Sequence, residues 1–201
     1  MKQSSFGIIG CTLLASIGVT CLTQPSVAQV SADIAFADAR ACPSLDFTPP
    51  PFRMPDRGAA ETDTGYDARV AAEFAKFNIR QPCVFNTETG MQIRLFEPVT
   101  NGESPTAKDF VQLRYESRRV NGDVLKSNLA DEQPALFDMS VAVPAWQEAL
   151  PHMRIGERWV LYAPPALTVS DKQTDEPTQG MIYEIQLLGL AQGDPSNESR
   201  N

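Results

Sequence analysis

The chain has 201 residues, enough for one domain of ordinary size with extensions at its ends. Its formal net charge of −8 argues against nucleic acid or an anionic membrane surface as a partner, because both would repel an acidic protein. A lone histidine, His152, gives no support to a Ser-His-Asp site or a multi-histidine metal site. We expect no metal and no other cofactor, and we expect His152 to be solvated or to cap the turn between a helix and a strand.

Residues 1–28 have the features of a secretory signal peptide. Lys2 supplies a positive start, residues 6–22 are nearly uncharged and mostly apolar, and the Ser-Val-Ala sequence at residues 26–28 offers small residues for cleavage. Cleavage after Ala28 would send the mature chain to the periplasm or the exterior and, by removing only Lys2, change the net charge from −8 to −9. Two alternatives are an uncleaved membrane anchor, which its glycines weaken, and a lipoprotein modified at Cys11 or Cys21.

Cleavage at that point leaves two cysteines, Cys42 and Cys83. In an exported chain they predict one disulfide. The loop that it closes spans about 40 residues, and the chain-entropy estimate for such a loop is at most about 4 kcal/mol. The sequence contains no Cys-x-x-Cys pair, so thiol–disulfide chemistry is not the expected function.

Residues 29–87 read as an extended, loop-rich leader, with five prolines between positions 43 and 55 and one helix predicted over residues 66–77. Alternating apolar residues then predict strands over residues 91–97, 110–119, 124–125, 158–162 and 181–190, with a hairpin turn at Asn121-Gly122. Residues 191–201 form a polar tail. This order predicts an α+β fold in which an antiparallel, half-wrapped sheet surrounds one short helix.

The most informative segment is residues 137–153, FDMSVAVPAWQEALPHM. An apolar extended run ends at Pro144, which suits the first turn of a helix because an amide hydrogen there has no partner. Trp146, Ala149, Leu150 and Met153 then share one helical face. On these residues alone, Trp146 is either part of a ligand site or an ordinary core tryptophan.

The segment resembles F-x-x-S-x-V-I-P-G-W-x-E-A-L-x-x-M of the FKBP-type peptidyl-prolyl isomerases. Three further blocks resemble the bacterial exported branch of that family: TGMQIRLFEPVTNGESPTAKDFVQLRY, RWVLYAPPAL and MIYEIQLLGL. The resemblance extends over residues 89–190 and implies an FKBP-like isomerase domain at residues 88–190. The helix before it resembles the end of the dimerising arm of that branch, but only a short piece is present, so dimerisation is not predicted.

The resemblance implies a proline-binding pocket. Tyr115 matches its wall tyrosine, Trp146 its floor, Tyr183 a late aromatic residue, and Val143 a residue whose backbone N–H binds the substrate carbonyl. The implied catalytic residues are Tyr115, Val143, Trp146 and Tyr183. The implied substrate-binding residues are Leu125, Lys126, Phe137, Ala142 and Val169.

Several positions depart from the family pattern. Lys126 stands where the family has an aspartate, Val169-Ser170 replaces its Tyr-Gly, and Ala145 replaces the glycine before the tryptophan. The loop 170–180 is polar and short by comparison. Asp131 stands where the family often has an arginine that pairs with the aspartate, so Lys126 and Asp131 are either the same pair with exchanged charges or two unrelated surface charges.

We therefore expect a peptidyl-prolyl isomerase that acts on proline-containing segments of exported proteins and that is weakened by these departures. The alternative is a non-catalytic peptide-binding or chaperone module on the same fold. A third reading, a structural envelope protein, has only the unusual leader and the disulfide in its favour.

Overall fold

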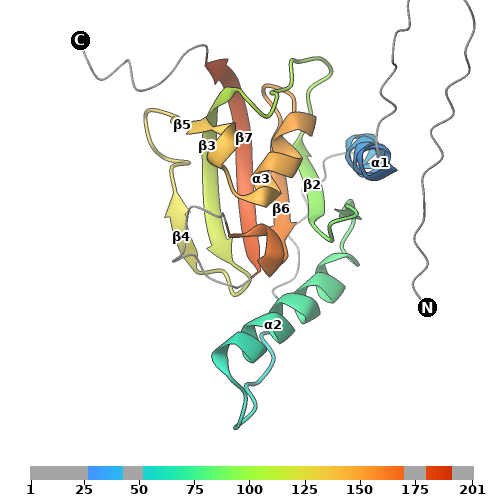
Figure 1. The fold of residues 1–201 in the computed structure, drawn as a ribbon, viewed down its shortest axis with the longest axis vertical. Coiled ribbons are helices and arrows are strands. Elements are labelled where there is room, and N and C mark those ends of the chain that lie inside the picture. The colour runs from blue at the N-terminus through green and yellow to red at the C-terminus, as the bar shows by residue number, and fades with distance from the viewer. Residues whose placement is uncertain (1–26, 43–51, 170–179, 192–201) are drawn as a thin grey trace, which may run out of the picture.

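The computed structural model describes residues 27–42, 52–169 and 180–191 (Figure 1). Its strands are β1 (Phe85–Asn86), β2 (Gln92–Glu97), β3 (Phe110–Arg119), β4 (Val124–Ser127), β5 (Ala135–Asp138), β6 (Arg158–Ala163) and β7 (Met181–Ala191). Its α-helices are α1 (Val27–Ala41), α2 (Asp63–Asn78) and α3 (Pro144–Ala149), and its 3-10 turns are η1 (Met139–Val141), η2 (Leu150–His152) and η3 (Pro165–Leu167).

The strands form one antiparallel sheet in the order β1-β2-β6-β7-β3-β4. β5 pairs with the N-terminal half of β3, and β4 pairs with its C-terminal half. α3 crosses one face of the sheet (Figure 1). The predicted α+β fold, an antiparallel sheet around one short helix, is confirmed.

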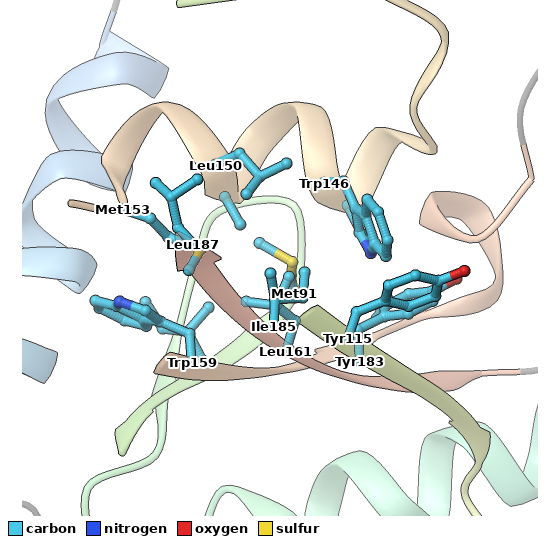
Figure 2. Close-up of a cluster of buried hydrophobic side chains, with 14 of the residues drawn as sticks. Met91, Tyr115, Trp146, Leu150, Met153, Trp159, Leu161, Tyr183, Ile185 and Leu187 are labelled. Carbon is cyan, nitrogen blue, oxygen red and sulfur yellow. The ribbon is translucent and has the colours of Figure 1, made fainter. Parts of the chain in front are cut away.

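The core lies between α3 and the sheet. Alternation along β3 turns Val111, Leu113 and Tyr115 toward the core, and Pro144 occupies the first position of α3 as its missing amide hydrogen allows. Figure 2 shows side chains of the sheet directed at side chains of α3 and of the residues just after it. The fully buried members of this layer include Met91, Ile93, Leu113, Leu150, Met153, Trp159, Leu161, Ile185 and Leu187.

The N-terminal region differs from the prediction. The helix predicted over residues 66–77 lies within α2, whose N-cap Thr62 accepts a hydrogen bond from the Gly65 N–H. The expectation of only one helix in residues 29–87 is wrong, because α1 precedes it and buries Phe36 against the core. The prolines after residue 42 made this region read as a loop-rich leader. α1 was not predicted because it is stabilised by contacts with residues far along the chain.

The predicted signal peptide lies almost entirely outside the described residues. Within the described ranges, no helix is long and apolar enough to cross a membrane.

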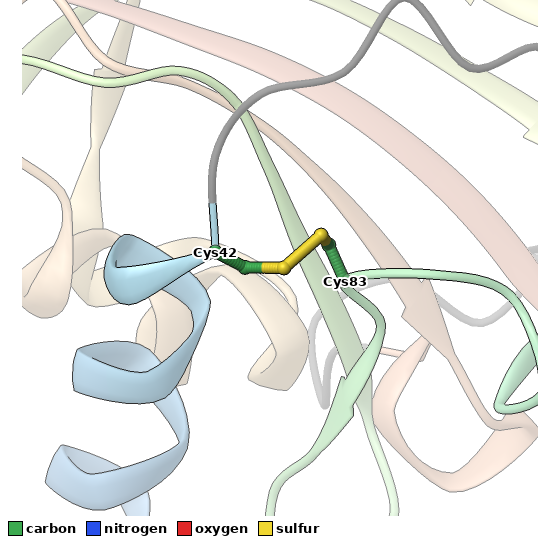
Figure 3. The surroundings of a disulfide bond; sticks show 2 residues. All are labelled: Cys42 and Cys83. Atoms are coloured by element: carbon green, nitrogen blue, oxygen red, sulfur yellow. A yellow bond between two sulfur atoms is a disulfide. The ribbon is translucent and has the colours of Figure 1, made fainter.

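The predicted disulfide is present between Cys42, just after α1, and Cys83, just before β1 (Figure 3). The two Cα atoms lie 5.6 Å apart across a sequence separation of 41 residues. The bond ties α1 to the edge of the sheet.

Replacing both cysteines, Cys42→Ser with Cys83→Ser, is expected to lower the free energy of unfolding by up to about 4 kcal/mol, because the unfolded chain then regains the freedom of a long loop. Urea denaturation of oxidised, reduced and substituted protein measures the difference, and reduced wild-type protein should match the double variant.

Mass spectrometry of non-reduced, exported protein should show a mature chain starting near Gln29 with the bond intact. Two free thiols in that material would contradict the predicted disulfide between Cys42 and Cys83.

Candidate functional site

Four aromatic rings from four different elements meet at one end of the core. The Trp146 ring on α3 lies 5.1 Å from that of Tyr115 on β3, 5.0 Å from that of Phe137 on β5 and 5.7 Å from that of Tyr183 on β7, between ring centroids. Tyr115 and Phe137 are 5.3 Å apart, and all four contacts have the edge-to-face geometry that aromatic pairs prefer. Figure 2 shows Trp146 directed at Tyr115 and Tyr183. We call these four residues the aromatic cluster.

The aromatic cluster is well packed. Tyr115, Trp146 and Tyr183 expose only 4%, 5% and 5% of their surfaces. The Trp146 Nε1 donor is buried and has no hydrogen-bond partner among the described residues. A buried donor without a partner costs about 1–3 kcal/mol. The described chain therefore leaves one hydrogen-bond donor at this end of the core unsatisfied.

The segment that leads into α3 places a backbone donor beside the cluster. Val143 is the N-cap of α3, and its carbonyl accepts hydrogen bonds from the backbone N–H groups of Trp146 at 2.9 Å and Gln147 at 3.1 Å. Ala142 is buried in the same core, and its carbonyl accepts from the Gln147 side chain at 2.9 Å. None of the described residues accepts from the Val143 N–H, which leaves that group free to bind a ligand carbonyl.

The two predicted site residues on β4 do not join the aromatic cluster. All four residues of β4 are exposed, Leu125 by 41%. Lys126 pairs with Ser117, two residues beyond Tyr115, so it leaves the sheet on the same face as Tyr115. Lys126 is therefore an exposed side chain on the same face of the sheet as Tyr115, outside the aromatic cluster.

The exchanged charge pair is not formed: no ion pair joins Lys126 to Asp131, although both residues are described. After β4, the Asn128 N–H pairs with the Tyr115 carbonyl, and the Asp131 N–H turns back to the Asn128 carbonyl. The chain thus bends at the residues that separate the two charges. The hypothesis of a swapped pair is wrong, and the reading as two unrelated charges holds.

Val169 is half-buried and is the last described residue before the segment 170–179. It follows η3, whose Leu167 packs against the core. The predictions about Ser170 and most of the loop 170–180 lie outside the described residues.

His152 is half-buried and packs against α1, a contact that the expectation of a solvated or capping side chain did not include. Its ring stacks on Phe36 of α1, with centroids 4.4 Å apart, and its Nδ1 lies 3.2 Å from an Asp33 carboxylate oxygen. Burial lowers the pKa of His152, and the nearby Arg40 cation acts in the same direction, while Asp33 opposes both. This contact could not be predicted, because α1 itself was not predicted.

A separate apolar cavity of about 280 Å³ lies between α2 and the sheet. The residues that line it include Ala71, Phe74, Tyr162, Pro164 and Met181, and none of them belongs to the aromatic cluster. None of its lining residues is charged. We place the candidate site at the aromatic cluster instead, because four rings converge there beside the Val143 N–H.

Sequence comparison identifies the class of protein that this fold and cluster define. The family model for FKBP-type peptidyl-prolyl cis-trans isomerases matches residues 101–188. The chain is 31% identical over 127 residues to the peptidyl-prolyl cis-trans isomerase Mip of Coxiella burnetii, covering 62% of this chain and 55% of that protein. It is 30% identical over 127 residues to the FKBP-type 22 kDa peptidyl-prolyl cis-trans isomerase of Escherichia coli, covering 60% of this chain and 61% of that protein.

Two solved structures share the fold. FkpA from Escherichia coli gives a TM-score of 0.58 at 20% identity and covers 64% of this chain and 61% of that chain. A peptidyl-prolyl cis-trans isomerase from Pseudomonas syringae gives a TM-score of 0.56 at 22% identity and covers 67% and 100%. Residues 101–188 therefore match the FKBP-type peptidyl-prolyl cis-trans isomerase family, and the chain is similar to bacterial proteins of that name. The chain spans less than two thirds of the length of the two relatives named above.

Proposed function

We propose that this protein isomerises X–Pro peptide bonds in exported polypeptides. The observation that carries the proposal is the aromatic cluster, built around Trp146 on an FKBP-type domain. Rotation about an X–Pro bond must break amide resonance, at a barrier of about 18–20 kcal/mol. The twisted amide has lost part of its charge separation, so apolar aromatic walls disfavour it less than they disfavour the planar ground state.

The Val143 N–H supplies the second part of the mechanism. A donor to the carbonyl next to the proline holds the substrate in a bent pose while the amide twists. In this proposal Trp146 is the floor, Tyr115, Phe137 and Tyr183 are the walls, and Ala142 keeps the entry segment apolar. Neither a nucleophile nor a metal takes part, and the described residues contain no cluster of ligands for a metal ion.

The proposed place of action is the periplasm or the exterior. Residues 1–28 act as a signal peptide in this proposal, and the isomerase domain extends over residues 88–190. The Cys42–Cys83 disulfide supports export, because such bonds persist in oxidising compartments.

A protease-coupled assay with proline peptides tests the proposal. Acceleration of cis-to-trans conversion that depends on the mature protein is the expected result. The close packing of the rings and the exposure of Leu125 favour a second candidate, a peptide-binding or chaperone module without catalysis. Binding of the same peptides with no acceleration would support that candidate and overturn the first.

Lys126 should bias the choice of substrate. Its exposed cation, on the same face of the sheet as Tyr115, is expected to favour peptides with an acidic residue beside the proline over those with a basic one, by about two- to fivefold in kcat/KM, and less at high salt. The variant Lys126→Gln should lose this preference. The matched variant Lys76→Gln, on α2, should keep it. An equal preference in wild-type protein and Lys126→Gln would show that Lys126 does not influence the choice of substrate.

A further inference from the structure

Asn128 lies at a break in the pairing of β3. β5 pairs with residues 110–113 of β3, and β4 pairs with residues 116–118. Arg114 and Tyr115, between these two stretches, pair with neither strand. On this side of β3, the backbone that carries the Tyr115 ring therefore lacks a strand partner.

The Asn128 residue fills that break. Its backbone N–H donates to the Tyr115 carbonyl at 3.0 Å, and its side-chain Oδ1 accepts from the Tyr115 N–H at 2.6 Å. Its side-chain Nδ2 donates to the Leu113 carbonyl at 3.1 Å. Asn128 exposes only 8% of its surface, so water cannot readily replace these bonds.

The primary amide acts here as a substitute for a peptide group. It offers an acceptor to Tyr115 and a donor to Leu113 at once, as a neighbouring strand would. The Tyr115 ring, two bonds from this backbone, packs against Phe137 and Trp146. Anything that shifts the Tyr115 backbone therefore shifts one wall of the aromatic cluster.

We propose that Asn128 is a positioning residue for isomerisation: it touches no substrate, and it fixes the Tyr115 wall against the Trp146 floor. The inference rests on the proposed function. It assigns a role to a residue outside the aromatic cluster and outside β4. It also explains how β3 keeps its geometry where its two neighbours on this side separate.

The variant Asn128→Asp gives a test that a general loss of stability does not imitate. Above the pKa of the new carboxyl, both of its oxygens are acceptors, and one of them then faces the Leu113 carbonyl without a hydrogen between them. Below that pKa the carboxylic acid again offers one donor and one acceptor, as the amide does. Burial raises the pKa of such a group, so the change falls within a range that is accessible to assay.

The expected result is a fall in kcat/KM of about tenfold to a hundredfold at pH 8, recovering toward wild type as the pH is lowered through that pKa. The loss should lie mainly in kcat, because Asn128 holds a wall and does not bind the peptide. The matched control is Asn78→Asp. Asn78 is also buried and donates to Gln92 Oε1 at 2.9 Å, but it lies on α2 and not in the aromatic cluster. This control should keep wild-type kcat/KM while it is folded.

Two further outcomes keep the test decisive. A folded Asn128→Asp variant with wild-type kcat/KM at pH 8, or with a loss that does not recover at low pH, overturns the inference. If the variant does not fold at pH 8, hydrogen exchange in the wild-type protein decides: the Tyr115 amide should exchange slowly, and rapid exchange would show that Asn128 does not hold it. A wild-type protein without isomerase activity is a failure of the proposed function. In that case, Tyr115 exchange and proline-peptide affinity test Asn128 separately.

Discussion

Replacing Trp146 with alanine is expected to abolish isomerase activity and to lower the free energy of unfolding by about 3–5 kcal/mol. The indole is 95% buried and contacts the three other rings of the aromatic cluster. Its removal takes away the floor of the proposed pocket and leaves a cavity that the facing strands cannot close. Urea denaturation measures the stability, and the protease-coupled assay measures the activity.

A milder pair of variants separates catalysis from stability. Trp146→Phe and Trp159→Phe each remove a buried indole and leave a smaller ring. Figure 2 shows the two tryptophans at opposite ends of the core. Trp159→Phe loses the bond from its Nε1 to Glu157 at 2.9 Å, so it should be destabilised yet active. If Trp146→Phe is the more active of the two, the pocket is not at Trp146.

Two regular patterns predicted the inward direction of Tyr115 and Trp146, whereas the grouping of these residues with Phe137 and Tyr183 was implied only by the family resemblance. Tyr115 has the alternation of β3, and Trp146 has the helical spacing set by Pro144, so both were expected to face the core. The position of β4 was harder to predict. Its pairing with β3 shifts register between Ser117 and Arg118, and no residue pattern in this short hairpin announces that shift.

Two other features could not be predicted because they depend on residues far apart in the sequence. Asn128 follows a serine in a polar stretch and reads as a turn residue, and only the separation of β4 from β5 gives its amide a role. α1 is the second such feature, because residues from distant segments of the chain set its place on the domain. It is held by Glu157, which is 117 residues away from Arg40.

The attachment of α1 gives the second large prediction. The Glu157 side chain has no exposed surface, and its oxygens accept from Arg40 Nε at 2.8 Å and from Arg40 Nη2 at 2.9 Å. They also accept from the Arg154 backbone N–H and the Trp159 indole, both at 2.9 Å. Arg40 further donates to the His152 carbonyl and lies over the Trp159 ring, 5.4 Å from its centroid.

Arg40→Ala is expected to lower the free energy of unfolding by about 3–5 kcal/mol, because it leaves a buried carboxylate without its cation. Glu157→Ala should cost a similar amount, since it leaves the Trp159 and Arg154 donors buried and unpaired. The double variant should cost less than the sum of the two. Glu73→Ala, which breaks the exposed pair with Lys76, should cost less than about 1 kcal/mol.

The variants should act on α1 and not on the aromatic cluster. With the disulfide intact, Arg40→Ala should make α1 more sensitive to proteolysis, because Phe36 then loses the anchor beside its contacts with His152 and Trp159. Isomerase activity should stay near wild type while the domain is folded, since Trp146 lies at the other end of the core. A loss of activity without a loss of stability would show that α1 is coupled to the site. Additive effects of Arg40→Ala and Glu157→Ala would show that the two side chains do not act as a pair.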